Sequence, residues 1–88
     1  MAYFAITYDL IKRKDYSTLW EEMESLNAHK AMNSFYLLEV NNTATQIKDH
    51  LKNFTDADDK LMVVEFSKKP TFTKANAGTN DWLNERFS

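Results

Sequence analysis

The first apolar stretch of the chain ends on a carboxylate and leads directly into a group of positive charges. The segment "YFAITYDLIKRK" places Asp9 at that end, and Lys12, Arg13 and Lys14 follow it closely. Three cations at this density are able to bind the phosphates of a nucleic acid. The alternative is a solvated loop whose charges keep the protein soluble. From its position alone, Asp9 either caps this loop or forms an ion pair with Arg13 or a nearby lysine.

A second group of cations, Lys68, Lys69 and Lys74, lies after the last strongly apolar stretch. The formal net charge of the whole chain is −2. Because affinity for nucleic acids grows with the number of phosphates that a protein neutralises, this charge argues against a protein that coats nucleic acids indiscriminately. Any binding of a nucleic acid must therefore come from local patches such as these two groups.

The sequence disfavours several other kinds of site. The chain has no cysteine, and neither His29 nor His50 has a partner at metal-ligand spacing. The acidic residues within 56–59 lack the glycine and the distal glutamate of an EF-hand loop and are typical of a turn. The single glycine, Gly78, leaves no glycine-rich phosphate loop.

The residues before and after the first basic group predict a strand and a helix. Residues 2–8 are rich in aromatic and β-branched types, so we expect a strand with two usable faces. Asp15 offers an N-cap for a first helix, which Asn27 ends. The apolar positions of this helix recur at helical spacing: Tyr16, Leu19, Trp20, Met23 and Leu26.

A hairpin is predicted next. Residues 29–32 favour a short strand, and residues 34–40, "SFYLLEV", favour a longer one. A turn near Asn33 would join the two strands. Because consecutive strands with so short a connection pair in antiparallel fashion, we expect these two to be neighbours in a sheet.

A second helix and a further strand complete the core. Thr43 and Gln46 match the capping box T-x-x-Q, which predicts a helix over residues 43–54. After a polar turn, residues 60–67 contain "LMVVEF", which is apolar on both faces, as a central strand would be. Both faces of the sheet must therefore be covered.

The last residues of the chain have a different character. "PTFTKANAGTN" is typical of a loop, with a short edge strand at residues 71–73, and "NDWLNERF" favours a short helix capped at Asn80. Trp82, Leu83 and Phe87 are too apolar to stay in solvent. We expect them to pack on the same subunit or on its partner.

The elements follow the order β-α-β-β-α-β, which predicts an α+β, ferredoxin-like sandwich with two helices on one face of an antiparallel sheet. We assign residues 1–69 to this core domain and residues 70–88 to a C-terminal extension with a short helix. Tyr3, Ala5 and one apolar row of residues 61–66 are then left on the other face. Because an apolar patch of that kind normally marks an interface, we predict a twofold homodimer packed sheet to sheet.

With its elements in this order, the sequence resembles the small CRISPR-associated Cas2 proteins. Their first strand ends in an aspartate before a basic loop and a helix, as "ITYDL" and the cations after it do here. Their third strand carries a serine before an aromatic residue, as Ser34 and Phe35 do. The virulence-associated D toxins share this plan. A closer likeness is to Cas2-like proteins of bacteria and phages, labelled SinR-like, whose motifs are similar to "YDL", "DYS", "IKDHL", "DKLMVVE" and "DWL" of this chain.

The resemblance implies roles for particular residues. In the family, the strand-end aspartates of two subunits face each other across the dimer axis and hold a divalent metal that activates water on a phosphodiester. Two carboxylates so close together repel unless one takes a proton or a cation lies between them. The resemblance thus implies Asp9 as a catalytic residue and a ligand of Mg²⁺. In a toxin-like enzyme, Tyr8 and Ser34 would lie near the scissile phosphate, and the basic groups would position the nucleic acid: Lys12, Arg13, Lys14, Lys68 and Lys69.

We therefore expect a Cas2-like homodimer that acts as a nucleic-acid-associated or protein-interaction module, with a weak metal-dependent nuclease activity left open. One alternative is a toxin-like metal-dependent endoribonuclease, and another is a non-catalytic regulatory protein of a phage or its host. The expected partners are a second copy, DNA or RNA, and another protein of a CRISPR, toxin–antitoxin or phage system. No apolar stretch of 18 residues and no signal-peptide pattern occurs in the sequence, so we expect a cytoplasmic protein with no membrane contact.

Overall fold

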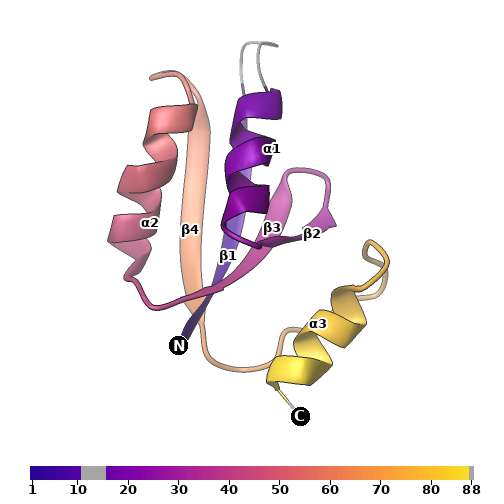
Figure 1. Cartoon of the computed structure of the whole chain (residues 1–88). Coiled ribbons are helices and arrows are strands. Elements are labelled where there is room, and N and C mark those ends of the chain that lie inside the picture. Colours follow the sequence, from indigo (N-terminus) through magenta and orange to yellow (C-terminus); the bar gives the residue numbers. More distant parts are fainter. Residues whose placement is uncertain (11–15, 88) are drawn as a thin grey trace.

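The computed structural model describes residues 1–10 and 16–87. Within these residues, one antiparallel sheet has the strand order β2-β3-β1-β4. Its strands are β1 (Ala2–Asp9), β2 (His29–Met32), β3 (Phe35–Val40) and β4 (Lys60–Phe66). The helices are α1 (Tyr16–Ser25), α2 (Ala44–Leu51) and α3 (Thr79–Arg86) (Figure 1). The predicted α+β, ferredoxin-like fold is confirmed.

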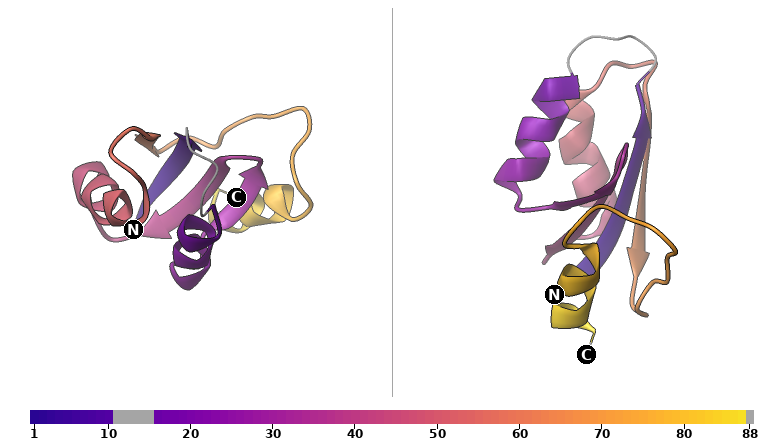
Figure 2. Two further views of the ribbon diagram at one scale, coloured as in Figure 1. Left: turned by 90° about the horizontal axis from the view of Figure 1, so that it is seen from above. Right: turned by 90° about the vertical axis from the view of Figure 1, so that its right-hand side faces the viewer.

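The first core lies between the sheet and the helices α1 and α2, which Figure 2 shows side by side on one face of the sheet. Side chains alternate between the two faces along a strand, so β1 sends Phe4, Ile6 and Tyr8 into this core. The helices contribute buried residues at helical spacing: Leu19, Met23, Ile47 and Leu51. We call the opposite side of the sheet the second face.

Local sequence signals explain where several elements begin and end. The predicted capping box is present, because Thr43 Oγ1 accepts a hydrogen bond from Gln46 N and Gln46 Oε1 accepts one from Thr43 N. The helix predicted over residues 43–54 is α-helical to Leu51 and then tightens into a 3-10 turn, η1 (Lys52–Phe54). Ser34 adopts a left-handed φ of 60° in the turn between β2 and β3. The N-cap predicted at Asp15 lies outside the described residues.

The strand β4 differs from its prediction. Its apolar pattern on both faces favours a central position, yet β4 lies at one edge of the sheet, with β1 as its neighbour. One apolar row, Leu61 and Val63, packs on the first core. The other row, Met62 and Val64, points to the second face and stays exposed. β4 therefore carries an apolar row on each face although it lies at the edge of the sheet.

The segment after β4 also differs from its prediction. Residues 67–78, all of which are described, form neither a helix nor a strand, so the edge strand predicted at residues 71–73 is wrong. Instead this segment crosses to β2, where Asn76 N donates a hydrogen bond to Ala31 O. The helix that follows starts at Thr79, one residue before the predicted cap.

α3 packs on the second face and forms a second core there. Trp82 and Leu83 are buried in it, and Tyr3, Ala5 and Phe66 of the sheet pack against them. Tyr3 and Ala5 lie on the second face, as predicted, and the C-terminal helix of the same chain packs against them there. The apolar residues of the tail were expected to pack on the same subunit or on its partner. In the structure, Trp82, Leu83 and Phe87 pack on the sheet of the same chain. No described helix has both the length and the hydropathy of a membrane span.

Candidate functional site at the end of β1

Asp9 is the last residue of β1, and its exposed side chain points to the second face. Lys60, the first residue of β4, lies directly opposite it in the antiparallel pair. The Cβ atoms of residues paired in this way are about 4.5–5.5 Å apart, so the two charged groups are within reach of each other. Together they border a shallow depression, whose other residues are Thr7, Tyr8, Leu61 and Met62. The strand end thus presents an acid beside a base.

One subunit does not supply a magnesium site in its described part. Nowhere in residues 1–10 and 16–87 do three side chains of His, Cys, Asp or Glu gather closely enough to hold a metal ion. The residue opposite Asp9 is a lysine rather than a second carboxylate. Because Mg²⁺ needs octahedral oxygen coordination, a single carboxylate would leave most of the coordination to water. The described residues of one chain therefore do not supply a complete set of ligands for the metal predicted at Asp9.

Tyr8 lies on the other face of the sheet from Asp9. Its side chain is 4% exposed and belongs to the first core. Its hydroxyl accepts a hydrogen bond of 2.6 Å from Trp20 Nε1 on α1. The structure therefore uses this tyrosine to join the sheet to α1, and does not present its side chain to solvent beside Asp9.

Ser34 lies in the turn between β2 and β3 and is half-buried. Its carbonyl oxygen accepts a hydrogen bond of 3.2 Å from Tyr8 N, so the backbone brings these two predicted site residues together. Ser34 also lines a small surface pocket with Trp20, Lys30 and Asn33. Asp9 does not line this pocket. The three predicted catalytic residues therefore lie near one end of the sheet but do not converge on one cavity of the described chain.

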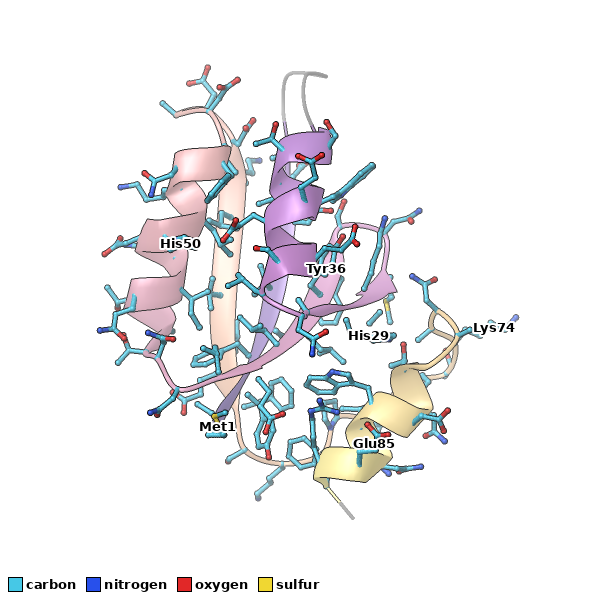
Figure 3. All side chains as sticks on the ribbon, in the orientation of Figure 1. Met1, His29, Tyr36, His50, Lys74 and Glu85 are labelled. Carbon is cyan, nitrogen blue, oxygen red and sulfur yellow. The ribbon has the colours of Figure 1, made fainter. Side chains whose placement is uncertain are left out.

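The predicted basic residues that the structure describes do not lie beside Asp9. Lys12, Arg13 and Lys14 lie outside the described residues. Lys68 and Lys69 are exposed just after β4, at the end of the sheet opposite Asp9. Lys69 Nζ donates a hydrogen bond to Asn84 Oδ1 of α3. Lys74 projects outward from the segment before α3 (Figure 3).

The second face is apolar over most of its area and is only half covered. Across β1 and β4 the residues on this face pair as Tyr3 with Phe66, Ala5 with Val64, Thr7 with Met62, and Asp9 with Lys60. The end that carries Tyr3 is covered by α3. At the other end Met62 is 61% exposed and Val64 is 48% exposed. Large apolar side chains exposed side by side in this way are typical of an interaction surface.

An apolar groove joins the covered and the open half of the second face. Its volume is about 280 Å³, and no charged residue lines it. Its floor comes from the sheet, including Phe35 and Val64, and its walls come from the segment after β4, including Phe72, and from Leu83 of α3. The described part of the chain therefore leaves an apolar recess that is lined by the exposed Val64 of β4.

Sequence reasoning missed the polar contacts that hold α3. His29 Nε2 lies 2.7 Å from Thr79 Oγ1, and Arg86 Nε donates a hydrogen bond of 2.9 Å to Glu39 Oε1. Burial, and then the positive charge of Arg86, lower the pKa of His29 from its usual 6.5. Figure 3 shows His29 beside the start of α3. These partners are 47–50 residues apart in the sequence, so no local pattern signals them.

A second titratable group with a shifted pKa lies in the first core. Burial raises the pKa of Tyr36 to about 12, with smaller contributions from Tyr8 and from the charge of Glu24. The rings of Tyr8 and Tyr36 are stacked with centroids 6.3 Å apart. Tyr36 therefore stays neutral over the physiological range of pH and acts as a packing residue between β3 and α1.

The chain matches a protein-family model over most of its length. The model of the CRISPR-associated protein Cas2 matches residues 1–74. The matched part contains the whole sheet with α1 and α2, and Asp9, Tyr8, Ser34, Lys68 and Lys69 lie within it. α3 lies outside the matched part.

Proposed function

Because the chain belongs to the family of CRISPR-associated Cas2 proteins, we propose that it acts as a homodimeric, nucleic-acid-associated module of a CRISPR system in the cytoplasm. The observation that carries this proposal is the open half of the second face. Met62 and Val64 are exposed there, next to an apolar groove. A twofold copy would bury these side chains against the same patch of its partner, which is how most homodimers assemble.

The oligomeric state in solution tests the proposed dimer. We expect sedimentation equilibrium of the full chain to give a dimer. Replacing Met62 by Asp puts a charge into the interface and should raise the dimer dissociation constant at least about 30-fold, the effect of a residue that contributes about 2 kcal/mol. Thr45→Asp, an exposed change on α2, is the matched control and should leave dimerisation intact. A chain that remains monomeric would refute the dimer.

Binding of a nucleic acid would use local groups of cations. Lys68 and Lys69 are exposed in each subunit, and a dimer doubles every such group. The measurement is the affinity for duplex DNA and for RNA as a function of salt. In a double Lys68→Gln, Lys69→Gln variant, the slope of log K against log salt should fall by about one for each phosphate that the protein no longer neutralises. Lys48→Gln on α2, where Lys48 pairs with Asp49 at 3.1 Å, is the control. Lack of affinity at low salt would rule this role out.

A triple variant of Lys12, Arg13 and Lys14 extends the same experiment to the first predicted basic group. Weaker binding by this variant, with unchanged binding by the Lys68 and Lys69 variant, would assign the contact to residues 12–14. The reverse result would assign it to the end of β4. Each outcome identifies the end of the sheet at which the nucleic acid lies.

Metal-dependent nuclease activity is a separate and weaker proposal. In this proposal the Asp9 side chains of two copies hold the metal, since no group of three His, Cys, Asp or Glu side chains gathers in residues 1–10 and 16–87 of one chain. The test is cleavage of RNA and duplex DNA with Mg²⁺ or Mn²⁺, before and after Asp9→Asn. Cleavage of RNA alone, abolished by this change, would favour the toxin-like endoribonuclease. No cleavage by the unmodified protein would leave the non-catalytic role. Full cleavage by the variant would rule out Asp9 as the ligand of the catalytic metal.

A further inference from the structure

The part of the chain beyond the family match adds a layer to the sheet. Residues 75–87, which contain α3, are here called the C-terminal cover. Trp82 and Leu83 of the cover are buried in the second core. The ring of Phe87 packs on that of Tyr3, with centroids 4.6 Å apart. The cover therefore occupies the end of the second face that carries Tyr3, and it consists of residues outside the matched part.

Polar contacts to two strands fix the cover in place. Asn76 N donates a hydrogen bond of 2.7 Å to Ala31 O, and Asn76 Nδ2 donates one of 3.1 Å to Lys30 O, both on the edge strand β2. Arg86 Nε pairs with Glu39 Oε1 of β3 at 2.9 Å, and both side chains are largely buried. Because apolar contacts and these bonds act together, the cover is a built part of the folded subunit rather than a loosely attached tail.

The cover restricts where another sheet can make contact. A helix with its side chains is about 10 Å across, and two sheets in direct contact lie about 10 Å apart. A helix that already lies on the Tyr3 end therefore prevents a second sheet from touching the first one there. The open end carries Thr7, Met62, Asp9 and Lys60.

The charges at the open end suit a second copy of the same chain. Asp9 and Lys60 lie directly opposite each other on neighbouring strands, so this end carries one acid and one base. In a twofold dimer, Lys60 of each copy is able to lie over Asp9 of the other copy. Such a self-complementary pair, beside the exposed apolar side chain of Met62, favours an isologous contact over a contact with an unrelated surface.

We propose that the C-terminal cover sets the register of the dimer: it blocks the Tyr3 end of the second face, so that the twofold axis passes through the open end near Thr7 and Met62. This inference rests on the proposed homodimer and adds to it the segment of this chain that selects where the axis lies. The Asp9 side chains of the two copies then lie at the same end of the assembly, close to the axis. The cover thereby positions Asp9 without touching it.

Distances between spin labels test the position of the axis. The chain has no cysteine, so one introduced cysteine carries the only label. Thr7→Cys labels the open end of β1, and Ser67→Cys labels the other end of the sheet, directly after β4. With the axis near Thr7, the Cα atoms of the two labelled residues should be about 10–15 Å apart for Thr7 and more than about 20 Å apart for Ser67, since a helix layer separates the sheets there.

A variant in which the C-terminal cover packs less firmly tests whether the cover sets the register of the dimer. The full chain with Trp82→Ala and Arg86→Ala loses the buried ring and the ion pair to Glu39. We expect its Thr7 distance distribution to broaden and its Ser67 distance to shorten, because the Tyr3 end becomes accessible. Asn80→Ala, an exposed change on α3, is the control and should leave both distributions unchanged. Hydrogen exchange in α1 and α2 shows whether the first core of the variant stays folded.

The outcomes separate the inference from the proposed function. A dimer with a short Thr7 distance and a long Ser67 distance supports the position of the axis. A dimer in which Ser67 gives the shorter distance overturns this inference and leaves the dimer standing. A folded variant with a loosened cover and unchanged distances would show that the cover does not set the register. A chain that stays monomeric at every concentration contradicts the proposed dimer itself.

Discussion

His29 and Thr79 join β2 to α3 through a contact of 2.7 Å between Nε2 and Oγ1. The Thr79 hydroxyl donates its proton to Asn76 O at 2.8 Å, so it accepts a hydrogen bond from His29 Nε2–H. Both the neutral ring with its proton on Nε2 and the charged ring can donate this hydrogen bond. Burial, which lowers the pKa of His29, favours the neutral ring. Arg86 lies on the same helix, and its charge opposes a second proton on the ring.

The pH dependence of stability follows from this contact. Because the pKa of His29 is lowered from 6.5 in the folded state, the unfolded state takes up a proton first as the pH falls. The contribution of His29 is fully present above about pH 6.5 and is progressively lost below it, until the pH passes the folded pKa. We expect the urea concentration at the unfolding midpoint to decrease as the pH is lowered from about 7.5 to 5.5. His29→Gln should flatten this dependence, and an equal slope in that variant would contradict the assignment.

The burial of α3 predicts the cost of truncating its main apolar anchor. Leu83 is 1% exposed within the second core. Leu83→Ala should lower the free energy of unfolding by about 2–5 kcal/mol, as a large-to-small change in a packed core does. Urea denaturation followed by circular dichroism measures it. The exposed change Asn80→Ala should stay within about 0.5 kcal/mol, and a loss of that small size for Leu83→Ala would show that α3 is not packed as described.

The capping box of α2 makes a separate prediction for the first core. Thr43→Ala removes the acceptor for Gln46 N and should cost about 1 kcal/mol of stability. Thr45→Ala, on the exposed surface of the same helix, should have a much smaller effect. Thermal unfolding of both variants measures the difference. Equal midpoints would mean that the cap contributes nothing to the folded state.

The titration of Tyr36 can be followed directly by ultraviolet absorbance. Its pKa of about 12 lies above the usual value of 10, so the unfolded state loses its proton first as the pH rises. The contribution of Tyr36 is complete below about pH 10 and is lost as the pH rises toward 12. Tyr36→Phe should remove one late phenol from the alkaline absorbance titration. A titration in which every tyrosine ionises near pH 10 would contradict the buried position.

The fold could be predicted from the sequence because its signals are local. The alternation in β1, the helical spacing of Leu19 and Met23, and the capping box at Thr43 each need fewer than a dozen residues to recognise. The order of these elements then leaves few arrangements. The hairpin and both helices of the core were found in this way.

The candidate site was predicted less completely because it depends on contacts between distant residues. The sequence places Tyr8 next to Asp9, but the alternation of the strand sends Tyr8 into the first core and Asp9 to the second face. Nothing in the sequence near Lys60 indicates that it lies opposite Asp9, since strand pairing sets that register. The same limit applies to the cover. Its apolar residues indicate that they must be buried, but not which strands receive them.

The two cores on opposite sides of one sheet have a consequence for partly unfolded molecules. The first core holds α1 and α2 without help from α3, since the two buried clusters share no residue. Unfolding of α3 alone would leave the sheet intact but would expose the apolar residues of its second face to solvent. At high concentration such a species is prone to aggregate. Conditions of purification and storage should therefore keep α3 folded on the sheet.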